Sequence, residues 1–201
     1  MAFSEITSLS TEYFLSDEAF DQLYPPFLRE LASQHWTPIQ VAKKAAAFLA
    51  SDKEAHILDI GSGTGKFCLS AAHFMPNAFF TGVEHRKNLV NHANKAKEKL
   101  GLSNVNFLHK NFKAIDFSEF DHFYFFNSFY ENLIGMDQDG YRIDYSSEKY
   151  HAYSHELYLK LSQRPSGTKI VTYFSMEEEI PNGYKVVGEE MKGVLKFWQK
   201  S

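Results

Sequence analysis

Apolar residues in this chain occur in short blocks that alternate with longer segments of helical spacing. Blocks of high β propensity lie at 57–60, 78–83, 105–108, 122–126 and 169–174. Between them, segments with apolar residues three or four apart lie at 38–49, 66–74, 86–100 and 147–161. Strands that alternate with helices predict an α/β fold, in which a mostly parallel sheet is covered by helices on both faces.

The two ends of the chain depart from this alternation. The tail contains two further apolar blocks, 184–187 and 194–198, with Gly188 and no helical segment between them. They bring the predicted total to seven strands. The lead-in, 1–37, has a helix-start signal at Ser16-Asp17-Glu18 and an interruption at Pro25-Pro26. Thr37-Pro38 predicts the N-cap and first residue of the next helix.

A glycine-rich turn joins the first predicted strand to the next helix. Ile57, Leu58 and Ile60 form the apolar strand, and Gly61-Ser-Gly-Thr-Gly65 follows at once. Glycines allow backbone to approach a ligand closely, and the first turn of a helix presents N–H groups that have no partner within the helix. This combination predicts a nucleotide-type site.

The residues of the turn narrow the choice of nucleotide. A P-loop needs a glycine where Ile60 stands and a hydroxyl where Phe67 stands. The dinucleotide pattern G-x-G-x-x-G fails from Gly61, and from Gly63 it ends at Cys68. Asp59 is the one charge in the strand, and a carboxylate there suits a ligand with cationic character better than a pyrophosphate.

Asp59, Gly61, Gly63 and Gly65 match every fixed position of the pattern Asp/Glu-x-Gly-x-Gly-x-Gly. Through this pattern the chain resembles the class I S-adenosylmethionine-dependent methyltransferases. The resemblance covers about residues 38 to 198. The resemblance implies a Rossmann-like, mostly parallel seven-stranded sheet with a C-terminal antiparallel strand pair. It also implies S-adenosyl-L-methionine as cofactor, bound by this turn with Ser62. We expect a methyltransferase domain over 38–201, preceded by the 1–37 lead-in as a possible lid.

The resemblance assigns three more residues to the cofactor. Glu84 ends the second predicted strand, where the family's carboxylate accepts the ribose hydroxyls. A simpler interpretation is that Glu84 caps the helix that begins near Arg86. Asn111 stands where the family has an acid that meets the adenine amino group, and Phe112 is expected to stack on adenine. Asn111 as a turn former and Phe112 as a core residue are the alternatives.

Asn127 and Tyr130 follow the fourth predicted strand. They resemble the Asn/Asp-Pro-Pro-Tyr/Phe motif of amino-group methyltransferases, although both prolines are absent. We expect Asn127 to lie beside the cofactor and to hold an acceptor N–H, and Tyr130 to flank the acceptor, as the two catalytic residues. The order Asn127-x-Phe129 and the entry Trp36-Thr37-Pro38 also bear a weaker similarity to the non-SET histone-lysine methyltransferases.

Composition limits the compartment and the partners. The net charge is −4, from 21 Lys and Arg against 25 Asp and Glu, so the whole chain has no electrostatic drive toward nucleic acid. We therefore expect nucleic acid to be an unlikely partner. The acceptor stays unidentified: a small molecule or a protein side chain is expected, and a protein lysine, a small metabolite and a nucleotide amine all stay open. No signal peptide or membrane span is predicted, and the single cysteine, Cys68, fits a reducing cytoplasm.

Two alternatives to a methyltransferase stay open. One is an NAD-dependent oxidoreductase, which Asp59 and the imperfect dinucleotide pattern disfavour. The other is a non-catalytic module that binds S-adenosylmethionine. His151 and His155 have a spacing that can bind a metal, but the glutamate of H-E-x-x-H and a third ligand are missing, so we expect no metal site.

Overall fold

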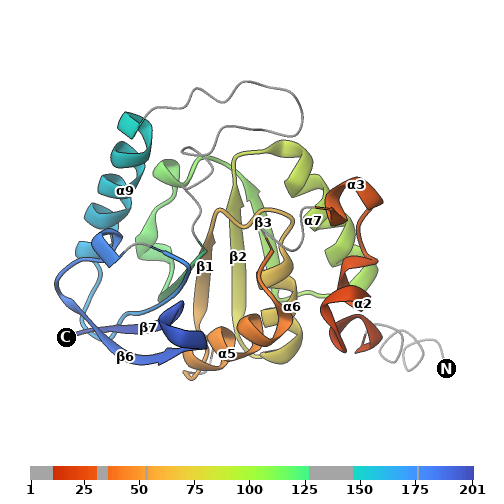
Figure 1. The fold of residues 1–201 in the computed structure, drawn as a ribbon, viewed down its shortest axis with the longest axis horizontal. Helices are drawn as coiled ribbons and strands as arrows, with labels where there is room; N and C mark the ends of the chain where they lie inside the picture. The colour runs from red at the N-terminus through yellow and green to blue at the C-terminus, as the bar shows by residue number, and fades with distance from the viewer. Residues whose placement is uncertain (1–10, 31–35, 53, 127–146, 176) are drawn as a thin grey trace.

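The chain forms one seven-stranded sheet with the strand order β3-β2-β1-β4-β5-β7-β6 (Figure 1). The structure is a computed structural model that describes residues 11–30, 36–52, 54–126, 147–175 and 177–201. The first five strands are parallel, and β7 runs antiparallel to both β5 and β6. The strands are β1 His56–Ile60, β2 Phe79–Glu84, β3 Val105–His109, β4 His122–Phe126, β5 Lys169–Tyr173, β6 Tyr184–Glu190 and β7 Leu195–Lys200.

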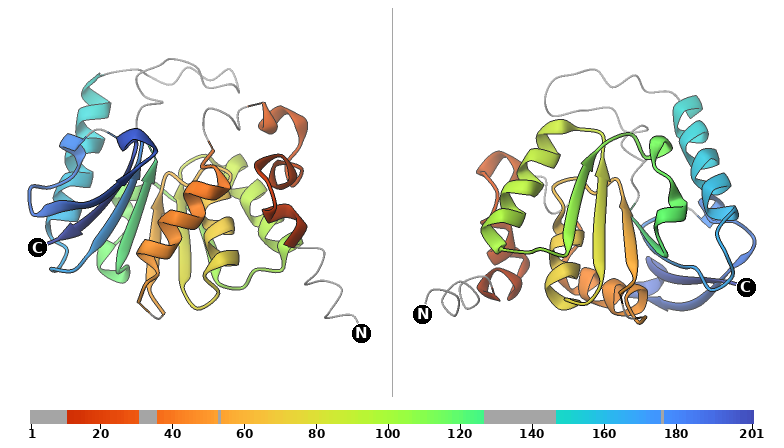
Figure 2. Two further views of the ribbon diagram at one scale, coloured as in Figure 1. Left: turned by 60° about the horizontal axis from the view of Figure 1, so that its bottom comes forward. Right: turned by 180° about the vertical axis from the view of Figure 1, so that it is seen from behind.

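Helices α6 Lys66–Phe74, α7 Lys87–Leu100 and α9 Ser147–Ser162 lie in the connections between parallel strands, which need such crossovers. Helices α2 Asp17–Asp21, α3 Pro26–Arg29 and α5 Ile39–Leu49 precede β1. Short 3₁₀ turns, including η2 Phe112–Ala114 and η3 Phe117–Glu119, lie between β3 and β4. Figure 2 shows α2 and α3 at the end of the molecule opposite α9.

Two hydrophobic clusters fill the space on the two faces of the sheet. One joins the apolar faces of α5, α6 and α7 to the side chains of Ile57, Phe80 and Tyr124. The other joins α9 and the 3₁₀ turns to Leu58, Phe123 and their neighbours. Alternate residues of a strand point to opposite faces, which is why Ile57 and Leu58 belong to different clusters.

These observations confirm the expected fold class, including the antiparallel strand pair at the C-terminus. Two helix starts differ from the prediction by one residue, and one of them is α7, which begins at Lys87 with Arg86 as its N-cap. Helix α5 begins at Ile39 with Pro38 as its N-cap, and the carboxylate of Asp17 accepts from the backbone N–H of Ile39 at 2.9 Å. The hydroxyl of Thr37 instead shares a buried hydrogen bond of 2.9 Å with the hydroxyl of Tyr124. Thr37 therefore anchors the entry of α5 to the central strand β4.

The described part of the lead-in is helical and docked. Ser16 caps α2 as predicted, accepting a hydrogen bond from the backbone N–H of Ala19 at 3.1 Å. The pair Pro25-Pro26 starts a short helix instead of only interrupting one, because Pro26 occupies the first turn of α3, where its missing N–H costs nothing. In the described parts of the chain, no helix has the length and apolar character needed to cross a membrane.

Candidate functional site

The glycine turn lies between the carboxyl end of β1 and the start of α6. The backbone N–H groups of Gly61 and Ser62 both donate to the carbonyl oxygen of Val83, at 2.9 and 3.0 Å, which holds the turn against β2. A Cβ on Gly65 would come within 2.5 Å of the Phe107 ring, so only glycine fits there. A Cβ on Gly63 would meet no described atom within 4 Å beyond its chain neighbours. Backbone at Gly63 is thus open to a ligand.

Asp59 is buried beneath this turn. Its side chain is 3% exposed, and the thiol of Cys68 donates a hydrogen bond to Oδ2 at 3.4 Å. Burial, with a smaller contribution from the negative charge of Glu84, raises the pKa of Asp59 to about 7. A cationic group placed beside this carboxylate would favour its ionised form. The geometry is therefore compatible with the expected cationic ligand.

Glu84 lies across the turn from Asp59 and is also buried. Its Oε2 accepts from the backbone N–H of Gly63 at 3.1 Å and from Nη2 of Arg86 at 3.1 Å. Its Oε1 accepts from the backbone N–H and Nε of Arg86, at 2.8 and 3.1 Å. Burial alone would raise the pKa of Glu84, but Arg86 and His85 bring it below its usual value. Glu84 thus connects the turn to the residue before α7.

These residues fit the cofactor that the resemblance implies. A carboxylate for the ammonium group, open backbone at Gly63 and a second carboxylate at the end of β2 are all present. The hydroxyls of Ser62 and Thr64 are buried without a hydrogen-bond partner among the described residues, which leaves two groups for a ligand to satisfy. Ribose hydroxyls at Glu84 would have to replace part of its contact with the Arg86 guanidinium.

Asn111 and Phe112 both have structural partners. Asn111 caps η2 by accepting from the backbone N–H of Lys113 at 3.0 Å, and its amide donates to the hydroxyl of Tyr153 at 3.1 Å. The Phe112 ring is buried and lies 5.7 Å from that of Tyr153. The Asn111 amide oxygen keeps a second lone pair for adenine. The adenine roles of both residues stay predictions.

Asn127 and Tyr130 lie outside the described residues, so their catalytic roles also stay predictions. The described chain before them ends at Phe126, the last residue of β4. In the strand order, β2 and β3 lie on one side of β1, and β4 and β5 lie on the other, so the order of the strands reverses at β1. Ligands of open α/β sheets bind at the carboxyl ends of strands at such a point.

Sequence reasoning missed a buried lysine beside the turn. Lys66, the first residue of α6, is 4% exposed and forms ion pairs with Asp21 and Asp17 of α2, at 2.7 and 2.8 Å. Its Nζ also lies 5.6 Å from the centre of the Trp36 ring. A lysine in the first turn of a helix interacts unfavourably with the helix dipole, so its presence there indicates that carboxylates from another segment neutralise its charge. Asp17 and Asp21 of the lead-in are those carboxylates.

Exposed basic residues surround the ends of β2 and β3, and they too were missed. His85 and Lys87 follow β2, His109 ends β3, and Lys110 and Lys113 follow it. We call these five residues the basic rim. The carbonyl of His85 lies 3.0 Å from Nε2 of His109, which brings the two loops together. The residues 85–87 and 109–115 contain no acid, so the local charge is positive although the net charge is −4.

Known proteins share this sequence pattern and fold. The chain matches the family described as a methyltransferase domain over residues 51–198. It is 52% identical over 54 residues to a tRNA (guanine-N(7)-)-methyltransferase of Synechococcus sp., and these are 27% of this chain and 23% of that protein. It is 36% identical over 92 residues to the enzyme of the same name from Nostoc sp., 43% of this chain and 42% of that one. The matches thus cover less than half of each relative's length.

A solved structure shows the same fold. It is the crystal structure of an RNA methyltransferase from Salinibacter ruber in complex with S-adenosyl-L-homocysteine. The TM-score is 0.57 with 21% sequence identity, and the match covers 82% of this chain and 92% of that one.

The tRNA methyltransferases among these relatives overturn our expectation that nucleic acid is an unlikely partner. That expectation used the net charge of the whole chain. RNA responds to the local field of the surface that it contacts, and the basic rim is positive where the whole chain is negative.

The expected enzyme class and cofactor are confirmed by the family match, which covers the glycine turn and all of the sheet except the last two residues of β7. The match also decides against the NAD-dependent oxidoreductase. The weaker similarity to histone-lysine methyltransferases stays a prediction. The chain belongs to the methyltransferase-domain family, whose methyl donor in this fold class is S-adenosylmethionine.

Proposed function

We propose that this protein methylates a nucleobase in RNA, with N7 of a guanine in tRNA as the acceptor atom. The observation that carries the proposal is the similarity to two proteins named tRNA (guanine-N(7)-)-methyltransferase, at 52% and 36% identity over the matched segments. The matches cover only part of each relative, so the acceptor needs support from the chemistry of this chain.

The basic rim supports an RNA substrate. Its lysines are exposed and lie after β2 and β3, at the same edge of the sheet as the glycine turn. Lysines at such an edge can neutralise RNA phosphates and hold a nucleotide over the site. Three lysines and two histidines are a modest charge, which suits an RNA held mainly by its target nucleotide.

A ring nitrogen is a suitable acceptor for a site of this kind. Guanine N7 has a lone pair in the plane of the ring and carries no proton, so its methylation needs no general base. S-adenosylmethionine supplies a methyl group on a positively charged sulfur. As the nitrogen–carbon bond forms, the sulfur–carbon bond breaks, its electron pair returns to sulfur, and the base takes up the positive charge.

The side chains then serve to hold and orient. Asp59 would face the ammonium group of the donor and Glu84 its ribose, while open backbone at Gly63 lets the ligand approach. Tyr130 would flank the base and exclude water, and an aligned acceptor lowers the barrier chiefly through proximity. Asn127, which we expect to hold an N–H, suits an exocyclic amine better than N7. The position of the methyl group in the product therefore distinguishes the two acceptors.

The test is methyl transfer to RNA. Purified protein is incubated with S-adenosylmethionine labelled in its methyl group and with unmodified tRNA transcripts, and the digested nucleosides are separated by mass. We expect N7-methylguanosine from the wild-type protein and none from Asp59→Asn. Label on an exocyclic amine would mean that this amine, and not N7, is the acceptor. Binding of S-adenosylhomocysteine without label in any RNA would contradict the proposal and favour a non-catalytic binding module.

A further inference from the structure

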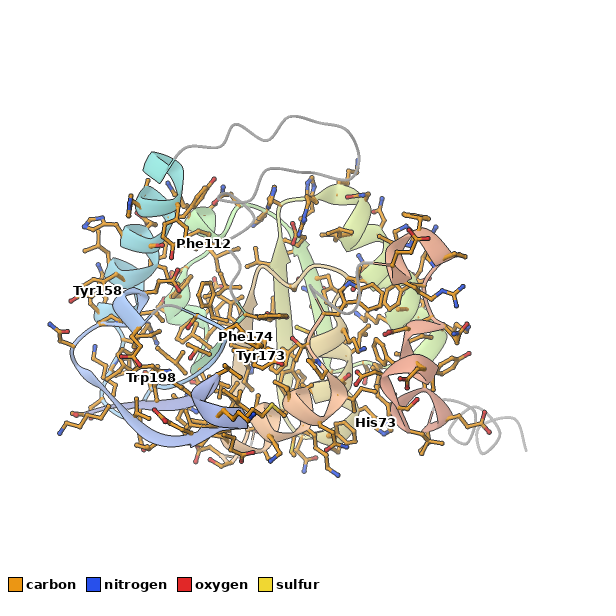
Figure 3. All side chains as sticks on the ribbon, in the orientation of Figure 1. His73, Phe112, Tyr158, Tyr173, Phe174 and Trp198 are labelled. Atoms are coloured by element: carbon orange, nitrogen blue, oxygen red, sulfur yellow. The ribbon has the colours of Figure 1, made fainter. Side chains whose placement is uncertain are left out.

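Three aromatic side chains meet at the carboxyl ends of β4 and β5. Phe126 and Tyr173 are paired across the two parallel strands, with ring centres 4.8 Å apart. Phe174, the next residue, has its ring centre 4.7 Å from that of Tyr173 and 6.4 Å from that of Phe126. Figure 3 shows the side chains of Tyr173 and Phe174 next to each other. We call Phe126, Tyr173 and Phe174 the aromatic platform.

Phe174 is unusual in both exposure and backbone conformation. Its side chain is 52% exposed, and its φ of +51° lies in the left-handed region. This conformation costs a residue with a Cβ roughly 1–2 kcal/mol, and glycine or asparagine adopts it more readily. The backbone is held there by the N–H of Phe174, which donates to the carbonyl of Val194 at 2.9 Å. The turn does not require a phenyl ring, so folding alone does not explain this side chain.

The aromatic platform lies on the acceptor side of the expected site. Asp59 and Glu84 belong to β1 and β2, whereas the platform belongs to β4 and β5 on the other side of β1. Asp17 of the lead-in lies close enough to Tyr173 to add to the effect of burial, and together they raise the pKa of the phenol. That carboxylate is already paired with Lys66 and accepts from the backbone N–H of Ile39, so the suitability of the platform for a base rests on its rings.

We propose that Phe174, supported by Tyr173 and Phe126, stacks on the face of the acceptor base and fixes the plane in which its reactive nitrogen lies. This inference rests on the proposed function, which it deepens by assigning a subsite for the base. Stacking contributes about 1–3 kcal/mol per base and tolerates any base, because every base has a π face. It orients the ring edge toward the methyl group without a hydrogen bond to the attacking nitrogen.

The first test separates stacking from folding. Phe174→Asn keeps a residue that tolerates the left-handed turn but removes the ring. We expect its melting temperature and its affinity for S-adenosylhomocysteine to match the wild type, while the KM for tRNA rises about 5-fold to 100-fold. Phe174→Tyr should restore the wild-type KM. The matched control is Phe79→Asn, which removes a ring that is 47% exposed at the start of β2. This residue lies at the amino end of its strand, whereas the aromatic platform lies at the carboxyl ends of β4 and β5.

The second test does not depend on methyl transfer. A Phe174→Trp variant, saturated with S-adenosylhomocysteine, is titrated with guanosine 5′-monophosphate while its fluorescence is compared with that of the wild type. We expect quenching in the variant beyond that seen for Trp36 and Trp198. Quenching in a protein that methylates no tRNA would support the base subsite while contradicting the proposed function. An unchanged KM in Phe174→Asn, or no added quenching in Phe174→Trp, would overturn the base subsite even if tRNA is methylated.

Discussion

The buried hydroxyl of Tyr24 donates a hydrogen bond of 2.8 Å to the backbone carbonyl of Thr64, in the middle of the glycine turn. Tyr24 follows α2 in the lead-in, so this contact fastens the lead-in to the backbone that is expected to bind the cofactor. Lys66, two residues after Thr64, makes a second connection to the same segment through Asp17 and Asp21. The lead-in is therefore coupled to the shape of the turn.

Replacing Tyr24 with Phe should weaken cofactor binding. The substitution leaves the Thr64 carbonyl without its buried donor, which typically costs about 1–3 kcal/mol of stability. We expect the turn to loosen and the affinity for S-adenosylhomocysteine to fall about fivefold or more, as measured by calorimetry. Tyr184→Phe is the matched control, because its buried hydroxyl donates at 3.1 Å to the Leu161 carbonyl, on the other face of the sheet. Equal losses of affinity in both variants would refute a specific coupling.

Lys66→Met should destabilise the protein by about 1–3 kcal/mol, because Asp21 and Asp17 would lose the cation between them. Adding Asp21→Asn to this variant should recover part of the loss, since only one of the two carboxylates then remains. Urea denaturation of the wild type, both single variants and the double variant measures the coupling. Strictly additive effects would mean that the ion pair does not stabilise the lead-in.

Asp59 should make stability depend on pH in an unusual direction. Its pKa of about 7 in the folded protein exceeds the ordinary value of 3.8, so the folded state holds this proton more tightly than the unfolded state. The stabilisation is complete below about pH 4 and is lost as the pH rises to about 7, with a slope approaching roughly 1.4 kcal/mol per unit. Asp59→Asn should remove this slope.

The measurement is urea denaturation of both proteins between pH 4 and pH 8. Other carboxyl groups titrate in both proteins, so the difference between the curves isolates Asp59. As pH rises, we expect the free energy of unfolding of Asp59→Asn to increase relative to that of the wild type. We also expect the variant to bind S-adenosylhomocysteine more weakly. Parallel curves would show that Asp59 stays ionised throughout this range.

The basic rim should make RNA binding dependent on salt. Each lysine that contacts a phosphate contributes a slope of about −0.7 to −0.9 in log K against log salt. Replacing Lys87 and Lys110 with alanine should therefore weaken tRNA binding and flatten that slope by about 1–2, as fluorescence anisotropy would show. The control pair Lys43→Ala and Lys185→Ala removes the same charge from α5 and β6. An equal effect of both pairs would indicate a response to net charge alone.

The sequence predicted the sheet and the glycine turn well, because both depend on local patterns. Strand β4 was placed residue for residue, and Asp59, Gly61, Gly63 and Gly65 identify the turn by spacing alone. The start of α5 was misplaced by one residue, since Thr37 bonds to Tyr124 of a distant strand. No local pattern encodes a partner 87 residues away.

The surroundings of the site were harder to predict for the same reason. The contacts of Lys66 and the pairing of Phe126 with Tyr173 depend on which elements become neighbours in space. The basic rim combines residues that follow two different strands, so counting charges over the whole chain hid it. Each of these features has a weak signal in the sequence, such as a lysine at a helix start, that becomes meaningful once the strand order is known.

The most direct measurement is a calorimetric titration of S-adenosylhomocysteine into the wild-type protein and into Glu84→Gln. We predict that the wild type binds one equivalent and that Glu84→Gln binds at least about tenfold more weakly, since a buried carboxylate that accepts two ribose hydroxyls contributes about 1.5–3 kcal/mol. The exposed Glu119→Gln should bind like the wild type. Equal affinities in all three folded proteins, or no binding to the wild type, would contradict the cofactor site at Asp59, Gly63 and Glu84.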